Sequence, residues 1–133
     1  MAASILIVED EILVALDMQC ILEERGYEVV DIAADLDGAL ASADNNIDLA
    51  LVDLNLRDGL TGPEIGKRLA NEHHANVVFV TANPRILGDG VAGTVGVLTK
   101  PTDEASLTAA VAFALARSSG EQLQAPPSLH CFS

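Results

Sequence analysis

Apolar and polar positions form a repeating pattern along this chain, in which short continuous apolar runs precede longer stretches with apolar residues at helical spacing. The first apolar run covers residues 4–8, and residues 10–25 follow it with one apolar helical face, formed by Val14, Met18, Ile21 and Leu22. A continuous apolar run is typical of a strand that is buried on both faces. The sequence therefore begins with a predicted buried strand and a predicted amphipathic helix.

The same succession continues to residue 117. Further strands are predicted over residues 27–34, 49–53, 77–81 and 95–99, and helices over residues 35–43, 63–73, 84–91 and 102–117. We expect the helix over 84–91 to be weak, because it is crowded by glycines, which are costly inside helices. Thr102 is expected to cap the last helix.

Regular alternation of strands and helices predicts an α/β fold, a doubly wound parallel sheet with right-handed crossovers and helices on both faces. The length of 133 residues, half of them apolar, suits one domain and is too short for two. We place this domain at residues 1–117. Residues 118–133 have no apolar periodicity and are rich in Ser, Gly, Gln and Pro, so we expect a flexible C-terminal tail.

Charge and composition exclude several classes of function. The net charge is −13, and the seven Lys and Arg residues are spread along the chain, which argues against a nucleic-acid surface. No basic residue precedes the first apolar run, and the longest apolar stretch, 107–116, is too short to span a membrane. Cys20 and Cys131 lie far apart in the sequence and show no metal-ligand spacing. We expect no structural disulfide between them, which is typical of a protein in a reducing compartment. We expect a cytoplasmic protein that binds neither nucleic acid nor membrane.

Polar residues stand where four of the predicted strands end. The first strand ends at Glu9 and Asp10, the third at Asp53, the fourth at Thr81 and the fifth at Lys100. Each residue alone has an ordinary explanation as a helix cap or a surface group. In a parallel sheet, however, these strand ends form the ligand-binding edge. Clustered carboxylates repel each other unless a cation lies among them, and oxygen ligands of this kind suit Mg²⁺.

The candidate nucleophile is the carboxylate of Asp53. The chain contains no glycine-rich nucleotide loop followed by Lys-Ser or Lys-Thr, and no Ser-His-Asp arrangement around a nucleophile elbow. Aspartate is an established acceptor of phosphoryl groups. Asp53 ends the predicted central strand, with the acidic pair on one side and Lys100 on the other.

Taken together, these motifs resemble the receiver domain of two-component response regulators. The resemblance covers residues 4–117 and depends on an ordered set of motifs, Glu9-Asp10, Asp53, Thr81 and Lys100-Pro101. It implies a flavodoxin-like, CheY-like fold with strand order 2-1-3-4-5 and a cis bond before Pro101. It also implies that Asp53 takes a phosphoryl group from a histidine kinase or a histidine phosphotransfer protein.

The resemblance further assigns roles around this acceptor. Asp53 and Asp10 would ligate Mg²⁺ directly, Glu9 would do so through water, and the backbone carbonyl of Asn55 would be a further ligand. Lys100 would contact the phosphoryl group, and Thr81 would move toward it and carry the signal to an unknown downstream protein. We expect no enzymatic activity beyond intrinsic autodephosphorylation.

The sequence departs from the receiver pattern on the output side. Val97 stands where receivers usually have an aromatic residue, Thr102 replaces a common Phe, and Arg57 stands in a loop that usually contains a proline. The aromatic residue that receivers usually place between the pocket and the output surface is therefore missing. An alternative interpretation is a pseudo-receiver that acts as a phosphorylation-independent interaction module.

Two further classes share parts of this pattern. A phosphatase of the haloacid-dehalogenase type has a second Asp two residues after its nucleophile, where this chain has Asn55. A flavodoxin stacks its flavin on aromatic side chains, and this chain is poor in aromatic residues and has no Trp. Both interpretations fit less well than a receiver.

The first helix is more apolar than its core-facing side requires. Ile12, Leu13, Leu16 and Cys20 fall on another side of it. Either neighbouring turns or the 118–133 tail cover these residues, or they form a surface that binds the helical bundle of the phosphodonor.

Overall fold

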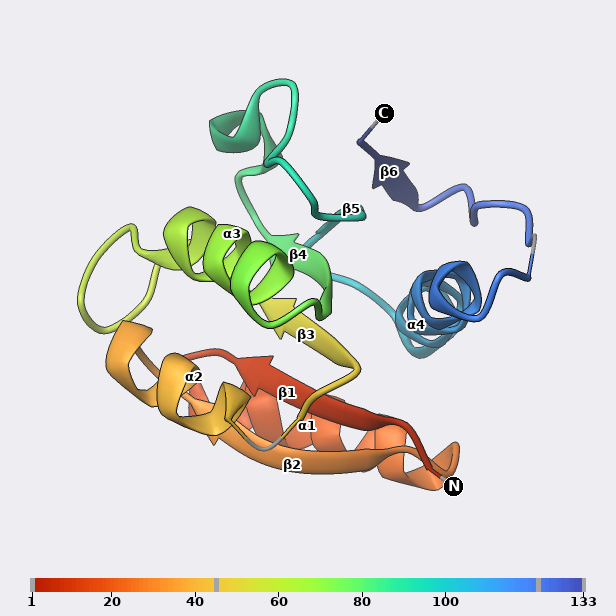
Figure 1. The fold of residues 1–133 in the computed structure, drawn as a ribbon, viewed down its shortest axis with the longest axis horizontal. Helices are drawn as coiled ribbons and strands as arrows, with labels where there is room; N and C mark the ends of the chain where they lie inside the picture. Colours follow the sequence, from red (N-terminus) through yellow and green to blue (C-terminus); the bar gives the residue numbers. More distant parts are fainter. Residues whose placement is uncertain (1, 45, 122, 133) are drawn as a thin grey trace.

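A six-stranded sheet with helices on both faces forms the core of the protein, as Figure 1 shows. The structure is a computed structural model and describes residues 2–44, 46–121 and 123–132. The strands are β1 (Ser4–Val8), β2 (Glu28–Ala33), β3 (Leu49–Val52), β4 (Asn76–Thr81), β5 (Gly96–Thr99) and β6 (Leu129–Cys131). The helices are α1 (Ile12–Glu24), α2 (Leu36–Ala43), α3 (Gly62–Glu72), the 3₁₀ helix η1 (Pro84–Leu87) and α4 (Glu104–Ser118).

The sheet separates two apolar layers. Ile5 and Ile7 of β1 belong to the layer that packs against α1 and α4, whereas Leu6 and Val8 belong to the layer under α2 and α3. All four side chains are completely buried. Burial on both faces explains why this strand is a continuous apolar run rather than an alternating one.

The order of the first five strands, β2-β1-β3-β4-β5, and their parallel pairing confirm the doubly wound fold predicted from the sequence. Helix ends also follow local sequence signals. The amide N–H of Gly26, at a φ of 88°, donates to the carbonyl of Glu23 and thereby ends α1. At the start of α2, the carboxylate of Asp35 accepts a hydrogen bond of 2.8 Å from the amide of Gly38.

The start of the last helix and the region before β5 differ from the prediction. Asp103, rather than Thr102, caps α4, because its carboxylate accepts a 2.7 Å hydrogen bond from the amide of Ser106. The weak helix predicted over 84–91 is only the short 3₁₀ helix η1. Gly88 and Gly90 follow with φ angles of 54° and 118°, which a continuing right-handed helix does not allow.

The sixth strand is absent from the prediction. Residues 118–133 show no apolar periodicity, yet Leu129–Cys131 pair antiparallel with β5 and extend the sheet beyond the expected strand order. A strand of this length has too few residues for a recognisable pattern, and it forms through tertiary contacts. The flexibility expected for the tail as a whole stays a prediction.

Across the described ranges, every helix is too short or too polar to cross a lipid bilayer.

Candidate functional site

The polar residues predicted to meet at one edge of the sheet do meet there. Because β1, β3, β4 and β5 are neighbours, their carboxyl ends open into one cavity of about 320 Å³. Its lining comprises Asp10, Glu11, Asp53, Asn55, Leu56, Thr81, Ala82, Asn83 and Lys100. This volume is roughly that of ten water molecules, so a phosphoryl group and a hydrated cation fit within it.

Lys100 joins the two carboxylates from β1 and β3. Its Nζ lies 2.8 Å from Oε2 of Glu9 and 3.0 Å from Oδ2 of Asp53. Glu9 is only 2 % exposed and Asp53 only 9 % exposed, so both ion pairs are shielded from solvent. Such pairs depend on good geometry to offset the cost of desolvation. The peptide bond between Lys100 and Pro101 is cis, as the sequence resemblance implies.

Burial and neighbouring charges shift the titration of two of these groups. Burial raises the pKa of the Glu9 carboxyl, and this effect outweighs the lowering by its hydrogen bond from Lys100. Burial by itself would lower the pKa of Lys100, but its hydrogen bonds to Glu9 and Asp53 and their charges together raise it. The ammonium of Lys100 is therefore firmly protonated at neutral pH.

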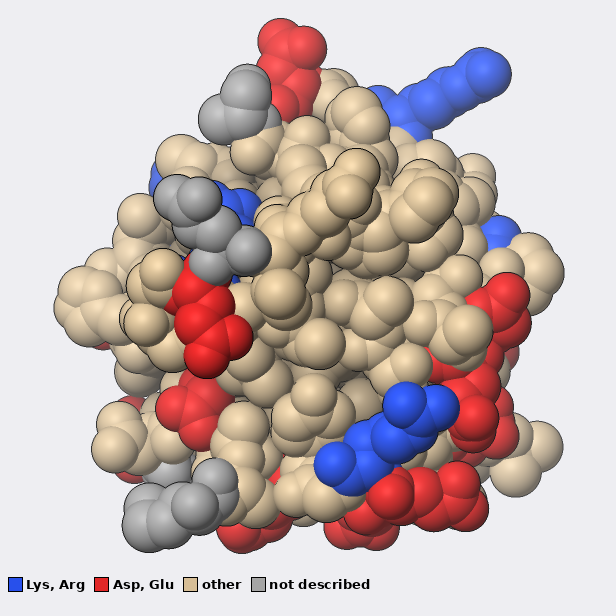
Figure 2. All heavy atoms as spheres, turned by 90° about the vertical axis from the view of Figure 1, so that its right-hand side faces the viewer, with Lys and Arg blue, Asp and Glu red and all other residues tan. Residues whose placement is uncertain are grey.

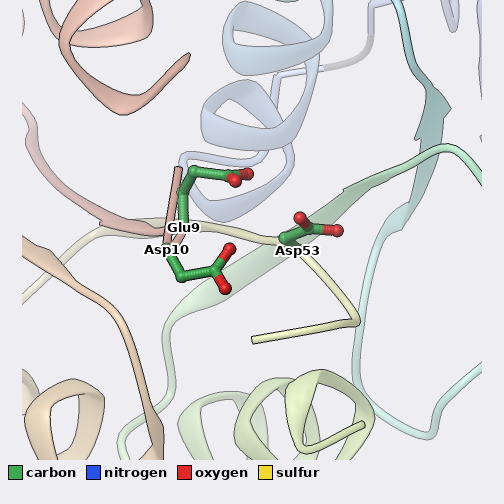
Figure 3. Close-up of side chains that lie close together, drawn as sticks. All are labelled: Glu9, Asp10 and Asp53. Carbon is green, nitrogen blue, oxygen red and sulfur yellow. The ribbon is translucent and has the colours of Figure 1, made fainter. Parts of the chain in front are cut away.

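A cluster of carboxylates offers a site for a divalent cation. One oxygen from each of Glu9, Asp10 and Asp53 lies within 4.8 Å of the others, and Figure 3 shows the three side chains. Among the described residues, Asp10 has no hydrogen-bond or ion-pair partner, so its carboxylate is available as a ligand. Oxygen donors of this kind, with an open cavity for water, fit the preference of Mg²⁺.

The backbone of the β3–α3 connection orients Asp53. Its Oδ1 accepts a 2.7 Å hydrogen bond from the amide of Leu54, while Oδ2 faces Lys100. The first residue of α3, Gly62, packs so closely that a Cβ at this position would lie 2.9 Å from the carbonyl carbon of Asp53. One carboxylate oxygen is thus fixed by the backbone, and the other lies beside the ammonium of Lys100.

Thr81 and Asn55 occupy different environments in the same cavity. Thr81 is 1 % exposed, and its Oγ1 accepts a 3.1 Å hydrogen bond from the amide of Asn83. Asn55 is exposed at the cavity wall, and the role of its carbonyl as a metal ligand stays a prediction.

The sequence did not predict an ion pair between the β3–α3 loop and the start of α2. The guanidinium of Arg57 contacts the carboxylate of Asp35, and its hydrogen bond holds the pKa of that carboxyl below its ordinary value. The neighbouring Asp58 accepts a 3.1 Å hydrogen bond from the amide of Leu36. These contacts join the β3–α3 loop to the start of α2. No local sequence motif predicts these contacts, because the partners in each are 22 residues apart.

Comparisons with known proteins agree with this geometry. The family description "Response regulator receiver domain" matches residues 5–112. The chain is similar to the phyllosphere-induced regulator PhyR of Methylorubrum extorquens, with 33 % identity over 118 residues that cover 86 % of this chain and 44 % of that protein. It is also similar to the transcriptional regulatory protein PdtaR of Mycobacterium tuberculosis, with 33 % identity over 119 residues that cover 85 % of this chain and 57 % of that protein.

A solved structure gives the same result for the fold. A CheY-like response regulator receiver domain protein from Methanospirillum hungatei superposes with a TM-score of 0.78 at 27 % identity, over 92 % of this chain and all of that one. The chain spans about half the length of the curated relatives that it matches. Family match, fold and site agree, and the chain belongs to the receiver domains of two-component response regulators.

Proposed function

We propose that Asp53 accepts a phosphoryl group from a histidine kinase or a histidine phosphotransfer protein, with Mg²⁺ bound beside it. The observation that carries this proposal is the position of the Asp53 carboxylate, between an acidic pair and the ammonium of Lys100. The mixture of carboxylates and one cation suits a phosphoryl group and a divalent metal together, because their charges balance.

The two oxygens of Asp53 have different tasks in this reaction. Oδ1 accepts the hydrogen bond from Leu54, so Oδ2 is the oxygen that attacks phosphorus. A new O–P bond forms as the P–N bond to the donor histidine breaks, and the histidine nitrogen leaves with the electron pair. Lys100, already 3.0 Å from Oδ2, then donates to a phosphoryl oxygen.

Asp10 and Asp53 would bind the cation directly, Glu9 would bind it through water, and the backbone carbonyl of Asn55 would be a further ligand. Bound Mg²⁺ supplies positive charge that stabilises the developing charge on the transferred group. These residues and the cation suffice for transfer of the phosphoryl group to Asp53. We propose that the chain acts as a phosphoacceptor and that its only turnover is the slow hydrolysis of its own aspartyl phosphate.

Thr81 is proposed to report the modification. Its side chain is buried at the end of β4 and lines the same cavity as Asp53. A phosphoryl group on Asp53 would give the Thr81 hydroxyl a strong acceptor for its proton. Thr81 would then move toward that group and alter the end of β4, and the change would be passed to a downstream protein.

An apolar surface on α1 is proposed to bind the phosphodonor. Ile12, Leu13 and Leu16 are 57 %, 80 % and 47 % exposed, and the described part of the C-terminal segment pairs with β5 instead of covering them. An apolar cavity lined by Val14, Met18 and residues of the β5–α4 connection lies beside the same helix and is also lined by Lys100. We propose that an amphipathic helix of the donor binds here and brings its histidine to the pocket.

The decisive test is labelling by a small phosphodonor. Acetyl phosphate with Mg²⁺ should add one acid-labile phosphoryl group to the wild-type chain, as measured by intact mass spectrometry. Asp53→Asn should remove the label completely, whereas Asp89→Asn, at an exposed carboxylate outside the pocket, should keep it. A wild-type chain that takes no label with Mg²⁺ would favour the pseudo-receiver interpretation.

A further inference from the structure

The C-terminal strand closes the open edge of the sheet and contacts both apolar layers. Leu129 is 6 % exposed and packs in the layer of α1 and α4, whereas Phe132, just after the strand, packs in the layer of α2 and α3. The amide of Phe132 donates a 3.0 Å hydrogen bond to the carbonyl of Val95. A short segment that reaches both layers is attached more firmly than its length suggests.

Two glycines make room for this segment. A Cβ on Gly96 would lie 3.1 Å from the Cα of Cys131 and even closer to the carbonyl oxygen of His130. A Cβ on Gly90 would lie 2.6 Å from Cγ of Phe132. Glycine within a strand weakens it and often marks the close approach of another backbone. The β5 edge is therefore shaped to receive an extended segment that carries an aromatic ring.

Phe132 also lies next to the strand that carries Thr81. Thr81 and Phe79 are two residues apart on β4, so their side chains point to the same face of the sheet. The rings of Phe79 and Phe132 are 6.4 Å apart between centroids. On its other side, the Phe79 ring meets α3, where a Cβ on Gly66 would lie 2.6 Å from its Cε1. The Phe79 ring is thus confined between α3 and the C-terminal segment.

We propose that Leu129–Phe132 is an autoinhibitory strand that occupies a partner-binding edge on β5 and that phosphorylation releases it. The proposal rests on the proposed function of Asp53. Movement of Thr81 alters the end of β4, and Phe79, which cannot move into α3, displaces Phe132. The freed β5 edge then pairs with an extended segment of the downstream protein, in which an aromatic side chain takes the place of Phe132.

The surroundings of this edge agree with a protein partner. Figure 2 shows the side of the molecule on which α4 and the C-terminal segment lie. Among the described residues, much of its centre is free of charged side chains, and acidic and basic ones lie toward its margin. An uncharged centre with a charged rim is the usual anatomy of a protein interface. The partner segment is therefore expected to be apolar and aromatic rather than basic.

Hydrogen exchange on the full chain tests the release. With Mg²⁺ and beryllium fluoride, a mimic of the phosphoryl group, the Phe132 amide should exchange at least about tenfold faster, while amides of β1 and β3 stay protected. Phe132→Ala and Gly96→Ala should give fast exchange in the strand without the mimic. Leu123→Ala, at an exposed position before the strand, should behave like the wild type.

A peptide probe tests the vacated edge. A fluorescent peptide of residues 126–132 carrying C131S should bind full-length Phe132→Ala and the beryllium fluoride form of the wild type, measured by anisotropy. It should not bind the untreated wild type, whose own strand competes. The same peptide with F132A should bind none of the three. A labelled probe that binds neither the variant nor the activated form overturns the proposed binding edge.

Treatment with acetyl phosphate, followed by intact mass spectrometry and hydrogen exchange on the same treated sample, separates the two proposals. If Asp53 takes the label from acetyl phosphate but the strand stays fully protected in the modified form, the autoinhibitory strand is wrong and the acceptor function stands. If Asp53 takes no label, both fail. Thermodynamic linkage supplies a further check. If phosphorylation weakens the attachment of the strand, then the attached strand must disfavour phosphorylation by the same free energy. Phe132→Ala should then raise the fraction of labelled chain at equilibrium.

Discussion

The pocket and the far edge of the sheet show two ways in which this chain specifies structure. The pocket is built from polar and charged residues that stand at the ends of four parallel strands, and its main contacts join Lys100 to Glu9 and Asp53. The edge beyond β5 is closed by Leu129–Cys131, with apolar contacts and glycines that admit a backbone. The pocket matches the receiver family, whereas the edge contains the unusual features, namely η1 in place of a full helix and an added strand.

The difference indicates how the two regions tolerate change. Residues of the pocket are constrained by charge, since removal of one partner leaves a buried charge uncompensated. Residues of the edge are constrained by shape and by backbone pairing, and the edge contains no buried ion pair among the described residues. A variant of the edge should therefore detach the strand without impairing phosphorylation, whereas a variant of the pocket should impair phosphorylation.

The largest expected effect comes from a pair of glycine variants. Gly62→Ala forces a methyl group against the backbone of Asp53 and Leu54 and should destabilise the protein by about 3 kcal/mol. Gly96→Ala meets only the C-terminal strand, which can leave, and should cost about 1 kcal/mol. Urea unfolding measures both, and acetyl phosphate labelling should be impaired only by Gly62→Ala. If Gly62→Ala and Gly96→Ala lost the same amount of stability, the pocket and the edge would not differ in their tolerance of change.

The next effect is stabilisation by the metal. Mg²⁺ relieves repulsion among Glu9, Asp10 and Asp53, so at a hundredfold excess over its dissociation constant it should raise the free energy of unfolding by about 2.7 kcal/mol. Asp10→Ala should lose most of this gain, whereas Asp89→Ala should keep it. Thermal unfolding with and without Mg²⁺ measures the difference. A wild-type melting temperature that does not respond to Mg²⁺ would contradict the site.

A smaller effect concerns the α1 surface. Leu13→Lys should slow phosphotransfer from a donor protein about tenfold, equivalent to about 1.4 kcal/mol, because a charge replaces an exposed apolar contact. Labelling by acetyl phosphate should not change. Leu123→Lys, at an exposed leucine in the C-terminal segment, is the matched control. If both phosphodonors were affected by Leu13→Lys, the variant would have damaged the pocket and the docking surface would lose its support.

The smallest effect is a pH dependence of stability without metal. Burial raises the folded-state pKa of Glu9 above 4.5, so folding favours its protonated form. The resulting stability is fully present below pH 4.5 and is lost as the pH rises through the folded pKa. Glu9→Gln cannot titrate, so the stability of the wild type relative to this variant should fall over that range. Urea unfolding of both proteins with a metal chelator, at several pH values, measures this relative stability. A relative stability that rises with pH would contradict the raised pKa of Glu9.

Residues with a local signal were predictable from the sequence. Buried parallel strands appear as continuous apolar runs, and the carboxyl ends of neighbouring strands converge by topology, so Glu9, Asp10, Asp53, Thr81 and Lys100 could be placed together in advance. Asp10, Asp53, Thr81 and Lys100 do line one cavity, and Glu9 pairs with Lys100 beside it, while the roles assigned to these residues stay predictions.

Features that depend on distant partners were not predictable in this way. β6 is three residues long, and its pairing depends on Gly96 and on the contact between Phe132 and Phe79, which are far apart in sequence. The contact of Arg57 with Asp35 likewise needs the fold before it can be recognised. Thr102 was misassigned by one position because Thr and Asp are both good caps, and the geometry decided for Asp103.

The short edge strand also bears on how this protein behaves at high concentration. When Leu129–Cys131 leaves, the β5 backbone presents unpaired N–H and C=O groups, which are a template for edge-to-edge pairing between copies. The net charge of −13 opposes such contacts at neutral pH through mutual repulsion. Acidification or high salt weakens this repulsion. Variants that detach the strand should therefore precipitate first under those conditions, and the acidic surface acts as a safeguard against aggregation.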